Sequence, residues 1–276
     1  MNEATTREAA SRDNQSGAAP ELLVETLGHV RVLTINRPER MNSLTPGLMD
    51  ALSESFVEAN IDPHVRAVIL TATGDRAFCA GRDLKEAKVA DDAGQPYRYF
   101  MSTLNRFIFE IILETYKPTI AAINGAAVAG GFELCLACDM RIAAEHAVMG
   151  LPEAKRGRGA HFSTVMLPRI IPRALALEML FRGDYIDARK ALQWGLLNSV
   201  TPRGGALEAA LELAGAIAKN APLTVRRMKE TAVKSSGMPF AAAMRLDEGI
   251  NPYLSEDRIE GTRAFVEKRE PKWKGR

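Results

Sequence analysis

Glu133 and Glu153 are the residues of this sequence best placed to transfer protons. Glu133 lies in an almost entirely apolar run directly after Gly130-Gly131, and Glu153 follows Gly150-Leu151-Pro152. A buried carboxylate without a partner is costly or takes up a proton, so something must offset the cost of placing one in apolar surroundings. A positioned carboxyl group of this kind is a candidate general acid or base.

Two glycine-containing segments could hold a developing negative charge. Gly130 and Gly131 open a predicted helix, whose first backbone N–H groups have no partner inside the helix and lie at its positive end. Glycine also lets a ligand approach the backbone closely. A second segment, Cys79–Asp83, contains Gly81. A helix start with exposed N–H groups, such as the one at Gly130, suits a developing oxyanion.

Each of these residues also has a plainer interpretation. Glu133 alone would be read as a salt-bridged or solvent-reaching helix glutamate, and Glu153 as a loop carboxylate after a proline. Gly81 and Gly130 would be turn glycines. The two glutamates and two glycine segments together favour a catalytic site over these separate explanations.

The elements that must position these residues alternate between strands and helices. Thr45 is the expected N-cap of a helix that begins at Pro46, and Lys117-Pro118 is the expected stop of a helix over 96–116. Apolar runs predict strands over 21–25, 29–36, 65–71, 119–124 and 140–144, and a helix over 130–138. This order predicts parallel strands with crossover helices in an α/β fold. After Thr201 only helices are predicted, over 206–219, 223–234, 241–253 and 255–268.

Composition excludes several other classes of protein. The chain has 276 residues and a formal net charge of +2, which gives no reason to expect a nucleic-acid partner. The most membrane-like window, 120–138, contains Asn124, Glu133 and three glycines, so no spanning helix is expected. Its three cysteines, Cys79, Cys135 and Cys138, argue for a reducing compartment. Cys135 and Cys138 are better read as buried side chains than as a redox or zinc pair, and no metal site is expected.

These motifs, taken in order, resemble the crotonase (enoyl-CoA hydratase/isomerase) superfamily. The resemblance runs from about Val24 to the end of the chain. Five segments carry it: the strand and turn at Val32–Asn42, the loop Ala77–Glu86, the helix start within Ala121–Asp139, the segment Met149–Glu153, and the C-terminal Phe265–Gly275.

The resemblance implies a fold, an assembly and a substrate. The fold is a spiral of ββα repeats over 18–200, followed by a helical region at 201–276. The polar segment 1–17 is expected from its composition to be a disordered tail. That helical region builds trimers or hexamers in the family. The substrate is an acyl-CoA thioester, and no other cofactor is expected. The protein itself is expected in the cytoplasm, without a membrane partner. The backbone N–H groups of Arg82 and Gly130 hold the thioester oxygen. Substrate contacts are expected from Ala80, Arg82, Asp83, Leu84, Lys85 and Gly130.

The retained glutamate pair favours hydration of a 2-enoyl-CoA. Glu133 is assigned as the base that positions water and Glu153 as the proton donor, sharing one proton near neutral pH. An isomerase that uses Glu153, an acyl-CoA hydrolase and a non-catalytic RNA-binding relative are the alternatives.

Two departures from the family pattern affect the acyl pocket. Arg82 replaces a small residue, and 157–163 lacks the family's proline and double glycine. His161, in that segment, either lines the pocket or is a structural histidine.

Overall fold

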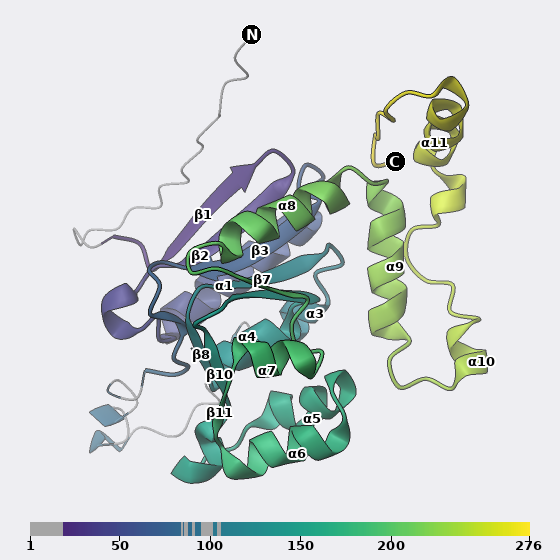
Figure 1. The fold of residues 1–276 in the computed structure, drawn as a ribbon. Coiled ribbons are helices and arrows are strands. Elements are labelled where there is room, and N and C mark those ends of the chain that lie inside the picture. The colour runs from purple at the N-terminus through teal and green to yellow at the C-terminus, as the bar shows by residue number, and fades with distance from the viewer. Residues whose placement is uncertain (1–18, 84, 86–87, 90–91, 95–101, 104–105) are drawn as a thin grey trace.

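The computed structural model describes residues 19–83, 85, 88–89, 92–94, 102–103 and 106–276 (Figure 1). The predicted disordered tail, 1–17, and the predicted substrate contact Leu84 lie outside these described residues.

A six-stranded sheet forms the centre of the molecule. Its strand order is β1-β2-β3-β7-β9-β12, and only the β1–β2 hairpin is antiparallel. The inner strands are short apolar runs, as expected for parallel strands covered on both faces. The strands are β1 (Leu22–Leu27), β2 (Val30–Ile35), β3 (Ala67–Ala72), β7 (Thr119–Ile123), β9 (Met140–Ala144) and β12 (Ser199–Thr201).

A smaller four-stranded sheet lies beside it, with the order β11-β10-β8-β4. Its strands are β4 (Ala77–Cys79), β8 (Ala126–Val128), β10 (Val148–Gly150) and β11 (Tyr185–Asp187). Strands β4, β8 and β10 are parallel, and β11 is antiparallel to β10. Consecutive strands therefore alternate between the two sheets. Strands β3, β7 and β9 belong to the large sheet, and each is followed along the chain by a strand of the small sheet, β4, β8 and β10 in turn. This alternation confirms the predicted crotonase-like ββα spiral.

Helices cover both faces of the large sheet. Helix α1 (Pro46–Ile61) begins as predicted, because the Thr45 side chain accepts a hydrogen bond from the Leu48 amide. Its buried side chains join the main core cluster with the inner residues of β2 and β3. Helix α8 (Ala206–Ala218) covers the opposite face, where Ala206, Ala210 and Ala214 pack on the sheet (Figure 1). The small alanine side chains let the helix lie close to the strands.

Short helices surround the small sheet, and the C-terminal helices extend away from it (Figure 1). Those near the small sheet are α3 (Ile108–Leu113), α4 (Gly130–Ala137), η2 (Pro152–Arg156), α5 (His161–Ile170), α6 (Arg173–Arg182) and α7 (Ala188–Gln193). The extension contains α9 (Pro222–Lys234), α10 (Phe240–Ala243), η3 (Pro252–Leu254) and α11 (Glu256–Glu267). A further turn, η1 (Pro38–Arg40), follows β2. The proposed boundary at 200/201 stays a prediction, and α8, just beyond it, packs on the core sheet.

Two predicted helices are wrong in part. The helix expected over 96–116 is reduced to α3, and β5 (Ser102–Thr103) and β6 (Arg106–Phe107) pair within the expected range. Residues 96–101 and 104–105 of that prediction lie outside the described part. The helix expected over 241–253 ends with α10 at Ala243, and Gly249, at φ +79°, and Pro252 lie in the non-helical segment and the short turn that follow. The three-residue strands β4, β8, β10 and β11 were not predicted.

Candidate active site

Three loops meet at one edge of the small sheet. They follow β4, β8 and β10, which are adjacent and parallel, so their carboxyl ends lie side by side. The loop after β4 contains Gly81 and Arg82, the loop after β8 leads into Gly130, and the loop after β10 leads into Glu153. Both glutamates therefore follow the carboxyl ends of adjacent strands in one sheet.

The loop after β4 is held by backbone and side-chain bonds. The Leu44 amide donates to the Gly81 carbonyl at 2.8 Å, and the Asp83 amide donates to the Leu44 carbonyl at 3.2 Å. Asp83 accepts from the Ser43 hydroxyl at 3.2 Å and lies 3.7 Å from the Arg37 guanidinium. These bonds give Arg82 a set position between two anchored residues.

The start of α4 packs directly against that loop. Gly81 has a φ of +82°, and a Cβ there would lie 3.3 Å from the Gly130 nitrogen. A Cβ on Gly131 would lie 2.2 Å from the Cys79 carbonyl oxygen, so only glycine fits. Ala129, at φ +54°, takes a conformation that is rare for a residue with a side chain. The loop that carries the Arg82 amide and the loop that carries the Gly130 amide are thus in contact, and both residues line one pocket.

Glu133 lies on the first turn of α4, as predicted, and is 6% exposed. Its Oε1 atom accepts two hydrogen bonds from Ser163, from the amide at 2.9 Å and from the hydroxyl at 2.8 Å. Burial raises the pKa of the Glu133 carboxyl, and the two bonds from Ser163 oppose that rise. Glu133 is therefore buried but partnered.

Glu153 lies on η2, lines the same pocket as Glu133, and is 8% exposed. Burial, together with a smaller contribution from the negative charge of Glu133, raises the pKa of the Glu153 carboxyl to about 7. Its Oε2 atom has no hydrogen-bond partner among the described residues. A carboxyl group with this pKa holds its proton for much of the time at neutral pH and can act as an acid.

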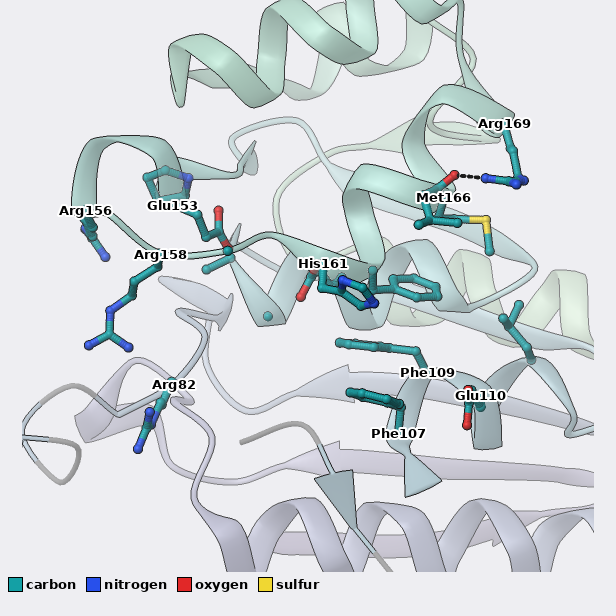
Figure 2. A pocket seen from close by; sticks show the side chains of 18 of the residues that line it. Arg82, Phe107, Phe109, Glu110, Glu153, Arg156, Arg158, His161, Met166 and Arg169 are labelled. Atoms are coloured by element: carbon teal, nitrogen blue, oxygen red, sulfur yellow. Dashed lines mark hydrogen bonds between the residues drawn. The ribbon is translucent and has the colours of Figure 1, made fainter. Parts of the chain in front are cut away.

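A pocket of about 960 Å³ contains both glutamates. Figure 2 shows Arg82, Arg156 and Arg158 on one side of Glu153, and Phe107, Phe109 and His161 on the other. The Phe109 and Phe162 rings stack with centroids 4.4 Å apart. The pocket thus has three arginines on one side of Glu153 and an aromatic end on the other, where Glu110 and Arg169 also line it.

The predicted site residues divide into those in the pocket and those beside it. Ala80, Arg82, Gly130, Glu133 and Glu153 line the pocket, and so does His161. Asp83 and Lys85 are not among the lining residues, and the Asp83 carboxylate is bonded to Ser43 and to the Lys85 amide.

Sequence reasoning missed Ser163 and the aromatic residues of α3 and α5. The sequence pattern places Phe109 only within a predicted helix and Ser163 only within the altered segment 157–163. The position of Ser163, thirty residues after Glu133, carries no local signal that the two side chains touch.

The cysteines play no part in this pocket. Cys79, Cys135 and Cys138 are free and buried, as expected of small core side chains. Burial raises the pKa of the Cys138 thiol to about 12, so it stays neutral. Within the described part of the chain, no group of His, Cys, Asp and Glu side chains could hold a metal ion. The described helices also include none that is both long and apolar enough to cross a membrane.

Comparison with known proteins places this site in a family. The family model described as enoyl-CoA hydratase/isomerase matches residues 25–276. The chain is 38% identical over 257 residues to (E)-benzylidenesuccinyl-CoA hydratase of Thauera aromatica, covering 91% of this chain and 98% of that protein. It is 39% identical to enoyl-CoA hydratase EchA19 of Mycobacterium tuberculosis, covering 94% and 98% of the two chains.

A solved structure agrees with these sequence relatives. The crystal structure of an enoyl-CoA hydratase from Mycobacterium tuberculosis H37Rv superimposes with a TM-score of 0.83 at 36% identity. The match covers 94% of this chain and 100% of that one. The chain belongs to the enoyl-CoA hydratase/isomerase family, the crotonase superfamily.

Proposed function

We propose that this protein is an enoyl-CoA hydratase in which Glu133 and Glu153 add water reversibly across the double bond of a 2-enoyl-CoA. The observation that carries the proposal is the pairing of a buried carboxyl group with a pKa of about 7, Glu153, with a second carboxylate in the same pocket. Hydration needs one group to take a proton from water and another to give a proton to carbon, and this pair supplies both.

The reaction begins with the thioester oxygen on the Arg82 and Gly130 amides. Glu133 takes a proton from water as the water oxygen bonds to C3, and negative charge moves to the thioester oxygen. The two amides stabilise that charge, and each such donor contributes about 3 kcal/mol in other acyl chemistries. Glu153 then gives its proton to C2. The pair ends with the proton on Glu133 instead of Glu153, and its return completes the cycle.

The acyl group is expected at the aromatic end of the pocket. Phe107, Phe109, Phe162 and Met166 line that end. The relatives include a hydratase of a benzylidenesuccinyl thioester and carnitinyl-CoA dehydratases, so acyl groups with rings or charges belong in any substrate test.

A panel of 2-enoyl and 3-enoyl thioesters tests this function. The wild-type protein should hydrate at least one 2-enoyl thioester, and Glu133→Gln and Glu153→Gln should each lower kcat by about 100-fold or more while remaining folded. Glu178→Gln, on an exposed position of α6, is the matched control and should keep full activity.

The alternatives predict different results in the same panel. An isomerase would shift 3-enoyl thioesters and would need only Glu153, so Glu133→Gln would stay active. Release of free CoA would indicate a hydrolase. Salt-dependent RNA binding without turnover of any thioester would indicate a binding protein. The intact and buried Glu133 favours hydration over all three.

We further propose that the protein assembles as a homotrimer or a hexamer in the cytoplasm. Large apolar side chains on the C-terminal extension support the assembly, because Phe240, Leu254 and Phe265 are each more than 80% exposed in the single chain. The three free cysteines support a reducing compartment. The proposed reaction needs no cofactor beyond the CoA part of the substrate, and no nucleic-acid or membrane partner.

A further inference from the structure

Ser163 gives both of its hydrogen-bond donors to one oxygen of Glu133. It is the third residue of α5 and is fully buried, at 0% exposure. Its amide and its hydroxyl reach Oε1 at 2.9 Å and 2.8 Å. Both bonds end on Oε1, so Ser163 leaves the other oxygen, Oε2, without a bond from its own donors.

The two donors differ in what they can do when Glu133 changes charge. The amide can only donate. The hydroxyl has a second acceptor within reach, the Ala160 carbonyl at 3.3 Å, and can rotate toward it. The hydroxyl can therefore donate to the ionised carboxylate and release it once Glu133 is protonated.

The surroundings of Glu133 make these bonds important for its charge. Burial favours the neutral carboxyl, and hydrogen bonds to the ionised form oppose burial. The largest of the opposing contributions come from the Ser163 amide and the Ser163 hydroxyl.

The other charged and titratable groups that line the pocket come from several elements. His161 lowers the pKa of Glu133 by its charge, whereas Glu153 bears a like charge. The lining groups are Arg82 after β4, Glu110 of α3, Glu153 and Arg156 of η2, Arg158, and His161 and Arg169 of α5.

We propose that the Ser163 hydroxyl is a positioning group that keeps Glu133 ionised and directs Oε2 toward the substrate water. The proposal rests on the proposed function of Glu133 as the base. Ser163 touches neither water nor thioester in this scheme and acts only through Glu133.

Replacement of the hydroxyl tests the proposal while leaving the amide bond in place. In Ser163→Ala, the acid limb of the plot of kcat against pH should move up by about one pH unit. The reason is that loss of a bond to the charged form raises the pKa of Glu133. Below that limb kcat should fall about tenfold, with KM nearly unchanged. Ser163→Gly also lacks the hydroxyl and cannot introduce a clash, so it should shift the limb equally.

Thr164→Ala is the matched control. The Thr164 hydroxyl donates to the same Ala160 carbonyl, at 2.6 Å, but it is exposed and is not bonded to Glu133. Its loss should leave the acid limb in place. A carbon-13 titration of labelled glutamate carboxyl groups, with the Glu133 signal identified through Glu133→Gln, reads the same pKa without any turnover.

The outcomes separate the two proposals. A wild-type protein that hydrates no thioester contradicts the proposed function, and the carbon-13 titration still tests Ser163. An unmoved pKa of Glu133 in folded Ser163→Ala and Ser163→Gly overturns the role of the hydroxyl. An equal shift in Thr164→Ala would overturn it too, because the effect would then come from the loop and not from Glu133.

Discussion

Glu153 lies in an environment that disfavours its charged form. Its Oε2 atom is buried without a hydrogen-bond partner in the described part of the chain, and its pKa is raised from 4.5 to about 7. A folded protein that holds a carboxyl group in this way loses stability when the group ionises. Catalytic utility and folding stability are therefore opposed at this position.

Removal of the charge should stabilise the protein in a pH-dependent way. The pKa of Glu153 is higher in the folded chain than in the unfolded chain, so its ionisation lowers the unfolding free energy as pH rises from about 4.5 to about 7. The unfolding free energy of Glu153→Gln, measured by denaturant unfolding, should therefore gain on that of wild type as pH rises. The difference between the two proteins should be about 2 to 3 kcal/mol larger at pH 8 than at pH 5. Glu178→Gln, at an exposed position of α6, serves as the control for the loss of a glutamate elsewhere in the fold. Equal effects of Glu153→Gln at both pH values would show that Glu153 has an ordinary pKa.

At the scale of elements, α4 is the part of the fold that positions Glu133. Its first turn packs on β4 through Gly131, and its last turn is held by Arg141, on β9. The Arg141 guanidinium donates to the Cys138 carbonyl at 2.7 Å and the Cys135 carbonyl at 3.2 Å. A cation at this end also complements the helix dipole. The short helix is thus fastened at both ends.

A methyl group at Gly131 should separate α4 from β4. The added Cβ would lie 2.2 Å from the Cys79 carbonyl oxygen, a backbone atom that cannot rotate away. Gly131→Ala should lower the unfolding free energy by about 3 kcal/mol and lower kcat together with it, because the Gly130 amide moves.

Gly215→Ala on α8 is the control, since a Cβ there meets nothing within 4 Å. It should raise stability by about 0.5 to 1 kcal/mol, as expected when alanine replaces glycine inside a helix. Calorimetry and turnover of the same samples would check both variants, and a fully stable, active Gly131→Ala would contradict the close packing.

At the scale of the whole molecule, the C-terminal extension has a polar attachment to the core and an uncovered apolar surface. Lys229 on α9 bonds to Asp139 at 2.8 Å and to the Lys117 carbonyl at 3.0 Å, and is itself buried. Trp273 donates a hydrogen bond to the Lys219 carbonyl at 2.7 Å. Phe240, Leu254 and Phe265, in contrast, are each more than 80% exposed.

These exposed side chains should be buried between copies of the chain. Sedimentation should give a mass three or six times that of one chain. Phe265→Glu combined with Leu254→Glu should shift the mass toward that of the monomer, because burying unpaired charges in an apolar interface is costly. Ile61→Glu, at an exposed apolar position outside the extension, should leave the mass unchanged. A monomeric wild-type protein would exclude the proposed assembly.

The sequence by itself determined the family, the candidate site residues and the order of the main elements. Glu133, Glu153, Gly81 and Gly130 stand out because a carboxylate beside glycines in an apolar run is unusual in any local context. The longer apolar strands and the Thr45 cap were also predictable, because their signals lie within a few neighbouring residues.

Only the tertiary structure decided how those residues meet. The strands β4, β8 and β10 are three residues long, too short for a periodic signal, yet their parallel pairing brings the three loops together. The partnership of Ser163 with Glu133 depends on how α5 packs on α4. The pKa of Glu153 likewise comes from burial and from the charge of Glu133 across the pocket. Contacts between distant segments leave no local pattern, so packing alone turned two glutamates into a coupled pair.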